Sequence, residues 1–222
     1  INKYDDNPYI QNLVQTATLN IKKPVQVKKS FVDNGPLGLF NLFLSTPLLE
    51  SIRIWTEKRL YQKHNKKLPR ELFNAYLGIE LAMSLTHCNC LKDYWSNKKF
   101  LGSKDISSVM GRNTFLHIRS CLRFYPDEEN IPVKRQDPLW HSRNILNHFL
   151  QNAASIAVPD GPVTLDENTV RTKARTQAKS YIPSKPVKFG IRFYSVVGWK
   201  YTYLYSLWDN GYFFSSLVNR KT

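Results

Sequence analysis

The hydrophobic pattern of the chain changes at residues 159–162, which have the sequence Pro-Asp-Gly-Pro. Before this segment, apolar residues recur at intervals of three and four, which is the spacing of one face of an α-helix. After it, residues 163–167, 186–197 and 200–207 have the β-branched and aromatic content of strands. Because the helices come first and the strands last, the sequence predicts an α+β fold that is mainly helical before the change.

The expected helices have recognisable starts. The first begins at Thr46, a suitable cap, has Pro47 in its first turn and ends near Lys66. The other expected helices span about 69–85, parts of 103–125, and about 138–156. The first two helices should each bury an apolar stripe, formed by Leu48, Ile52, Trp55 and Arg59 in one and by Leu72, Tyr76, Ile79 and Met83 in the other. Gly78 lies inside the second stripe at a cost of about 1 kcal/mol relative to alanine, and close packing on a neighbour would explain it.

The chain divides into three expected regions. Residues 1–45 lack sustained periodicity and should form an irregular arm, followed by a helical region at 46–160 and strands at 161–222. The first residue is Ile1, so we expect the sequence to be a piece of a longer reading frame. With no run of about 18 apolar residues and no secretory signal, we expect no membrane span and a location inside the cell.

Cysteine and histidine side chains offer metal ligands at 87–90 and 117–121. These are His87, Cys88, Cys90, His117 and Cys121. A Cys-x-Cys pair is tighter than the spacing of structural zinc sites, so we expect no zinc and three reduced cysteines.

Charge is the strongest indication of a partner. The chain carries a net charge of +15, and no acidic residue lies between Glu167 and Asp209. That interval contains eight basic residues: Arg171, Lys173, Arg175, Lys179, Lys185, Lys188, Arg192 and Lys200. Such a bias attracts polyanions, and we expect double-stranded DNA rather than an anionic membrane.

Six of these residues are the candidate DNA contacts: Lys173, Arg175, Lys179, Lys185, Lys188 and Arg192. Tyr181 and Phe189 lie among them, and such interleaving can hold phosphates while a ring packs on a sugar or base. The alternative is a solvated charged face. Arg112, Arg119 and Arg123 either extend the same surface or pair with acids such as Asp127.

A Leu-Asp-Glu sequence at 165–167 follows a short apolar run. It places Asp166 at an expected strand end, where a carboxylate can bind a divalent metal ion. The alternative is that Asp166 and Glu167 are simply a solvated strand end.

The same acidic pair begins a series of motifs that resembles the piggyBac-type transposases and the host proteins derived from them. The series continues with Lys-Ala-Arg at 173–175, Tyr-Ile-Pro-Ser-Lys-Pro at 181–186 and Lys-Phe-Gly-Ile-Arg at 188–192. The family has glycine where this chain has Ala174. Upstream segments that also resemble the family are 73–79, 83–85, 93–96, 110–115 and 122–124. The resemblance extends from about residue 39 to 205.

This resemblance implies that 161–222 form the first antiparallel strands of a truncated ribonuclease H-like domain, and that 46–160 form a dimerisation and DNA-binding region. It makes Asp166 the first of three catalytic aspartates that hold two Mg²⁺ ions, with Glu167 a neighbour and not a ligand. Intact relatives bind transposon ends and catalyse Mg²⁺-dependent strand cleavage and transfer. The resemblance also implies a nuclear location.

Residues 209–217, Asp-Asn-Gly-Tyr-Phe-Phe-Ser-Ser-Leu, faintly resemble the motif around the second family aspartate. Their distance from Asp166 is too short for that role. Asn-Gly is a strong turn sequence, so we favour a plain turn after Asp209. No acidic residue follows Asp209, so the carboxylate set is incomplete in either case.

We therefore expect a transposase-derived chain that binds DNA without cutting it. The alternatives are a non-catalytic domesticated module that binds DNA or a protein partner, and a decayed reading frame whose product does not fold stably. Strands without covering helices leave an open sheet edge, so a homodimer is a candidate assembly.

Overall fold

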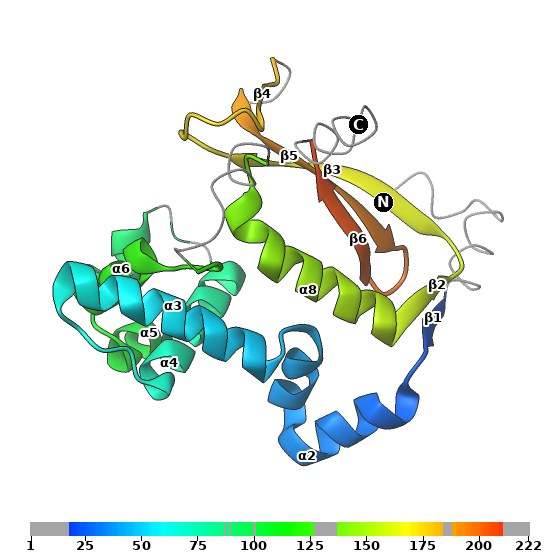
Figure 1. Ribbon diagram of the computed structural model, residues 1–222, viewed down its shortest axis with the longest axis horizontal. Helices are drawn as coiled ribbons and strands as arrows, with labels where there is room; N and C mark the ends of the chain where they lie inside the picture. The colour runs from blue at the N-terminus through cyan, green and yellow to red at the C-terminus, as the bar shows by residue number, and fades with distance from the viewer. Residues whose placement is uncertain are drawn as a thin grey trace. The chain divides into compact units, whose positions relative to one another are not determined.

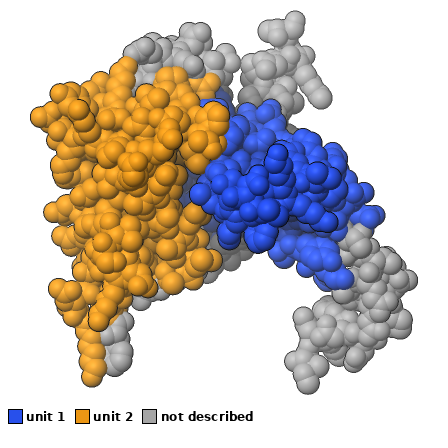
Figure 2. Space-filling view, turned by 90° about the horizontal axis from the view of Figure 1, so that it is seen from below, with its two compact units in different colours: residues 1–45, 130–222 blue, residues 46–129 orange. Residues whose placement is uncertain are grey.

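The computed structural model describes residues 18–86, 88, 90–99, 101–126, 137–183 and 188–210, and the fold is α+β as predicted. Contacts divide the chain into two compact units, one made of residues 1–45 and 130–222 and the other of residues 46–129 (Figure 2). Over the described residues, no single helix is long and apolar enough to cross a membrane.

The unit at 46–129 is helical. It contains α3 (Thr46–His64), α4 (Arg70–Leu85), the 3₁₀ helix η1 (Leu91–Trp95), α5 (Lys104–Val109) and α6 (Arg112–Cys121). Helices α3, α4, α5 and α6 confirm the helices expected at 46–66, at 69–85 and in parts of 103–125, whereas η1 was not expected. Buried side chains recur about every four residues: Leu48, Ile52, Thr56 and Leu60 on α3, Phe73, Tyr76 and Ile79 on α4, and Phe115, Ile118 and Cys121 on α6. Their burial supplies the main stabilisation of this unit.

The buried face of α3 differs in its second half from the expected one. Trp55 and Arg59 are only half-buried, whereas Thr56 is fully buried. Thr56 Oγ1 accepts a hydrogen bond of 3.1 Å from the backbone N–H of Arg123, so the polar atom has a partner inside the core.

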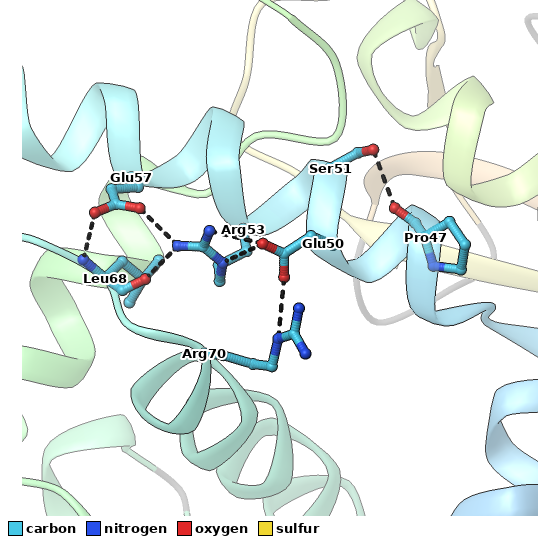
Figure 3. A network of polar contacts seen from close by, with 7 residues as sticks. All are labelled: Pro47, Glu50, Ser51, Arg53, Glu57, Leu68 and Arg70. Atoms are coloured by element: carbon cyan, nitrogen blue, oxygen red, sulfur yellow. Dashed lines mark hydrogen bonds and ion pairs between the residues drawn. The ribbon is translucent and has the colours of Figure 1, made fainter.

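A network of ion pairs joins α3 to the segment that precedes α4 (Figure 3). Arg53 donates to Glu50 at 2.7 Å, to Glu57 at 2.6 Å and to the carbonyl of Leu68 at 2.7 Å. Glu57 accepts in turn from the Leu68 N–H at 3.2 Å, and Arg70 Nε contacts Glu50 at 3.3 Å. The spacing of Glu50, Arg53 and Glu57 places the three side chains on one side of the helix.

The described residues of the other unit form two helices and six strands. The helices are α2 (Pro24–Phe43) and α8 (Trp140–Ile156). The strands are β1 (Thr18–Ile21), β2 (Ala157–Asp160), β3 (Val163–Arg171), β4 (Lys179–Tyr181), β5 (Phe189–Gly198) and β6 (Leu204–Asp209). This unit groups α8 with the sheet, whereas the sequence analysis grouped residues 138–156 with the preceding helices.

The expectation of an irregular arm at 1–45 was wrong for residues 24–43, which form α2. Gly35 has φ of 58° and Pro36 follows it, so the helix is kinked and its pattern is split into two short pieces. The apolar residues Val25 and Val32 are about four-fifths exposed. The helix therefore does not bury a regular apolar stripe, which is the pattern by which a helix is recognised in a sequence. Its C-terminal end packs on α8, where Phe43 stacks on Phe149 at 5.7 Å.

The larger sheet is antiparallel, and β5 is its central strand. One edge of β5 pairs with β3, and the other pairs with β4 and then β6. Across the described strands, β3 pairs with β5 alone. Helix α8 packs against β6 on one face of this sheet (Figure 1). A separate two-stranded sheet joins β1 to β2.

Candidate nucleic-acid interface and the Asp166 strand

Asp166 lies in the middle of β3 and not at a strand end. The expected strand ended at Glu167, but β3 continues to Arg171, because Thr169 and Val170 are β-branched and pair with β5. The Asp166 side chain is exposed, and its Oδ1 accepts a 2.8 Å hydrogen bond from the Glu167 N–H. The carboxylate is therefore accessible to solvent and to ligands.

Glu167 points to the opposite face of the sheet, since successive side chains alternate along a strand. Its Oε2 lies 3.6 Å from Nη1 of Arg192, which is two residues from the cross-strand partner Tyr194. The two acidic side chains thus lie on opposite faces of the sheet, and Glu167 forms an ion pair with Arg192.

Asp209 ends β6, and Asn210 forms a turn. Asp166 pairs with Ser195, and Asp209 pairs with Phe193 two residues away, so both acids belong to the same face of the sheet. They flank β5 on opposite sides, which separates their strands by roughly 10 Å. Carboxylates that share one Mg²⁺ ion each lie about 2.1 Å from it, so this pair does not form a shared site.

The Asp209 side chain is fully buried and belongs to an ion cluster with α8. Arg143 contacts Asp209 through Nη1, donates through Nη2 to Asp209 Oδ1 at 3.1 Å, and pairs through Nε with Asp137 at 2.6 Å. Burial lowers the pKa of Arg143, but hydrogen bonds to the two carboxylates outweigh it and the pKa lies above its ordinary value. Asp209 thus joins β6 to α8, which supports the turn interpretation over a displaced catalytic aspartate.

No sequence pattern identified Arg143 as the partner of Asp209, because 66 residues separate them. The side-chain contacts of Asn210 were also not predicted from the sequence. Its Nδ2 donates to Ser180 Oγ at 2.7 Å and to the Ala178 carbonyl at 3.1 Å, which holds β4 beside the end of β6.

Five of the six predicted DNA contacts lie at one end of the sheet, where β3 ends, β4 lies and β5 begins. Lys173 and Arg175 are exposed in the loop between β3 and β4, and Lys188 is exposed just before β5. Lys179 on β4 and Arg192 on β5 are half-buried. We call Lys173, Arg175, Lys179, Lys188 and Arg192 the basic end of the sheet. Lys185 lies outside the described residues.

Asp166 is separated from this end along β3. Arg171, five residues later, pairs with Gly190, so the separation is roughly 17 Å at strand spacing. Two of the cations have partners within the sheet. Arg192 forms an ion pair with Glu167, and the Lys179 Nζ lies 5.8 Å from the centre of the Phe189 ring.

Arg112 is exposed, whereas Arg119 and Arg123 have partners in their own unit. Arg119 Nε lies 3.5 Å from Glu80 Oε1, and its guanidinium carbon lies 5.8 Å from the Phe115 ring. Arg123 Nη1 donates to the Leu122 carbonyl at 3.0 Å. The acidic partner of Arg119 is Glu80, which was not predicted from the sequence. Asp127 lies outside the described residues.

Cys88 and Cys90 are exposed, Cys121 is buried, and all three are free thiols. His87 lies outside the described residues. In the part of the chain that the structure describes, no group of three or more His, Cys, Asp or Glu side chains could hold a metal ion.

Comparison with known proteins gives two matches. Residues 35–208 match the protein-family model described as Transposase IS4, which is most of the chain. The fold resembles that of a piggyBac transposase in the cryo-EM structure of its synaptic complex with hairpin DNA, with a TM-score of 0.70 and 22% sequence identity. The match covers 78% of this chain and 38% of that transposase chain, so this chain spans well under half of its length.

The family match, over residues 35–208, includes the Asp-Glu pair and the basic motifs. This chain therefore belongs to the Transposase IS4 family and has the fold of part of piggyBac transposase, which confirms the resemblance drawn from its motifs.

Proposed function

We propose that this chain is a transposase-derived protein that binds double-stranded DNA through the basic end of the sheet. The observation that carries the proposal is the exposure of Lys173, Arg175 and Lys188 in a stretch that has no acidic residue between Glu167 and Asp209. Cations without nearby acids keep their field in solution, and a duplex carries one negative charge per about 1.7 Å of its axis.

Contacts of this kind are to phosphates. They fix the position of the protein on DNA but carry no direct information about the base sequence. We therefore expect the basic end to give affinity and strong salt dependence, with little sequence preference of its own.

The second part of the proposal concerns Asp166. We infer that β3 to β6 correspond to the first strands of a ribonuclease H-like domain, and that Asp166 occupies the position of its first metal-binding aspartate. The family implies divalent metal use by its intact members. An exposed carboxylate on the face that Glu167 does not share fits one ligand of such a site.

The described residues do not fit a complete two-metal site. Two ions about 3.5–4 Å apart need carboxylates from several chain positions. Glu167 faces away from Asp166, and Asp209 is held by Arg143. We therefore expect the 222-residue chain to bind DNA without cleaving it.

DNA binding is tested by fluorescence anisotropy with a labelled blunt duplex of random sequence. If 6–10 phosphates are contacted, affinity falls about 10³- to 10⁵-fold between 50 and 200 mM salt. An affinity that does not change with salt would contradict the proposal.

Cleavage is tested with a supercoiled plasmid and Mg²⁺, using Asp166→Asn as the control. We expect no Mg²⁺-dependent nicking by either protein and no loss of duplex affinity in Asp166→Asn, because that substitution removes a negative charge. Nicking by the wild type that disappears in Asp166→Asn would show an active enzyme.

A nuclear location and a homodimer belong to the same proposal. A DNA partner supports the first. The second is supported by β3, whose outer edge has no strand partner among the described residues and can pair with a second copy. Light scattering at micromolar concentration distinguishes a monomer from a dimer, and a monomer mass would contradict the proposed homodimer.

A further inference from the structure

Two aromatic side chains lie exposed at the basic end of the sheet. Tyr181 on β4 and Phe189 on β5 are direct cross-strand partners, with ring centroids 5.0 Å apart. Tyr181 is 54% exposed and Phe189 is 51% exposed. Large rings normally dominate cores and interfaces, so a pair held half in water is available to contact a ligand.

Cations border this pair. Lys179 is two residues from Tyr181 on the same face of β4, and its Nζ lies 5.8 Å from the Phe189 ring centre. Lys188 directly precedes Phe189 in the sequence and is exposed. Phe189 therefore has a lysine ammonium near its ring, and the sequence between Glu167 and Asp209 has no acidic residue.

The pair also shares a face with Asp166. Phe189 and Ser195 are six residues apart on β5, so their side chains point the same way, and Ser195 is the cross-strand partner of Asp166. The separation along the strand is roughly 20 Å. A nucleic acid that lies on this face can contact the aromatic pair and extend toward Asp166.

We propose that Tyr181 and Phe189 form a stacking platform for an unpaired nucleobase, with Lys179 and Lys188 binding the flanking phosphates. The inference rests on the DNA binding proposed above and adds the class of ligand. A base inside a duplex has both faces covered by its neighbours, whereas an unpaired base offers a face to a ring. The adjacent cations favour a nucleotide over an apolar protein segment, because a nucleotide places an anionic phosphate beside a flat base.

The test compares two labelled probes, a blunt duplex and the same duplex with a four-nucleotide single-stranded extension. The wild type should bind the extended probe more tightly. Tyr181→Leu/Phe189→Leu keeps apolar side chains on both strands, and should weaken binding of the extended probe about 5- to 150-fold with blunt-duplex affinity unchanged. Equal loss on both probes, or no loss, overturns the platform.

Tyr201→Leu is the matched control. Tyr201 is 54% exposed and has Lys200 Nζ 5.6 Å from its ring, but it follows the opposite end of β5 and lies near Asp160. It should bind both probes like the wild type. A loss on the extended probe as large as that of the double variant would mean that any exposed ring suffices, and would overturn the assignment.

If Tyr181→Leu/Phe189→Leu does not fold, a second measurement with a single variant tests the same proposal. A 2-aminopurine in the extension should lose fluorescence on binding the wild type, and Phe189→Leu alone should reduce that loss. Unchanged quenching in Phe189→Leu overturns the platform. Failure of the proposed function has a different signature, because the wild type would then show no salt-dependent binding to the blunt duplex.

Discussion

At the scale of single residues, the Arg143 cluster is the feature of the sheet unit most sensitive to substitution. Asp209 is fully buried, and a buried charge is tolerated only when it is paired and hydrogen-bonded. Removing Asp209 takes away the carboxylate that Nη1 of Arg143 contacts, although Asp137 still pairs with the guanidinium, so the charge balance of the buried cluster is lost.

We predict that Asp209→Ala lowers the free energy of unfolding by about 3 kcal/mol, measured by urea denaturation. The triple variant Asp137→Asn/Arg143→Met/Asp209→Leu should recover much of this loss, because it removes all three charges of the cluster. If the triple variant is no more stable than Asp209→Ala, lost packing and not the altered charge balance explains the effect.

Asp137 gives the same cluster a pH dependence. Burial raises the pKa of Asp137, but hydrogen bonds from Arg143 and from the Leu139 N–H outweigh it, so its pKa lies below the ordinary 3.8. A carboxyl group whose pKa is lower in the folded state stabilises the protein above its unfolded pKa. This contribution is lost as pH falls through the folded pKa.

The free energy of unfolding should therefore fall with pH below about 4, and Asp137→Asn should flatten that dependence. Chemical denaturation at several pH values between 2 and 6 measures it. Asp105→Asn, at an exposed acid on α5, is the control and should keep the wild-type dependence. Identical slopes for Asp137→Asn and the wild type would refute the assignment.

Residue identity predicted the candidate site only in part. The positions of Lys173, Arg175 and Asp166 could be predicted from charge and motif, because those properties are local. The opposite faces of Asp166 and Glu167, the burial of Asp209 and the buried Thr56 depend on pairing between distant segments. Only the tertiary structure supplies that pairing.

At the scale of elements, Gly190 in β5 and Gly78 in α4 differ in the space that surrounds them. A Cβ on Gly190 would lie 2.5 Å from Thr169 Cγ2 and 2.7 Å from the Val170 carbonyl oxygen, so β3 and β5 approach too closely there for any side chain. A Cβ on Gly78 would meet nothing within 4 Å, so the close packing expected from the sequence does not explain that glycine.

We predict opposite effects of alanine at these sites. Gly190→Ala should destabilise the protein by about 1–3 kcal/mol through overpacking between strands. Gly78→Ala should stabilise it by about 1 kcal/mol, because it lies inside α4 with open space around it. Thermal or urea unfolding measures both, and a Gly190→Ala protein as stable as the wild type would contradict the close approach of the strands.

Elements with strong local signals were predictable. Helices α3 and α4 begin near Pro47 and Pro69, and β5 is rich in β-branched and aromatic residues. Strands β1, β2 and β4 have three or four residues each, which is too short for a period to be recognised. They form because a partner strand is present.

At the scale of the whole molecule, the net charge of +15 predicts a polyanionic partner but not the surface of the protein that would bind it. The fold collects five cations at one end of the sheet, although the sequence spreads them over twenty residues: Lys173, Arg175, Lys179, Lys188 and Arg192. That arrangement follows from the pairing of β4 with β5, which no local pattern predicted.

We propose that the basic end of the sheet, and not net charge alone, binds duplex DNA. The most direct measurement is the slope of log affinity against log salt for the wild type and two variants of equal charge. Lys173→Gln/Arg175→Gln should reduce the magnitude of the slope by about 2. Lys28→Gln/Lys29→Gln, at exposed positions on α2, should leave it unchanged. Equal reductions in both variants, or none in the first, would contradict the account.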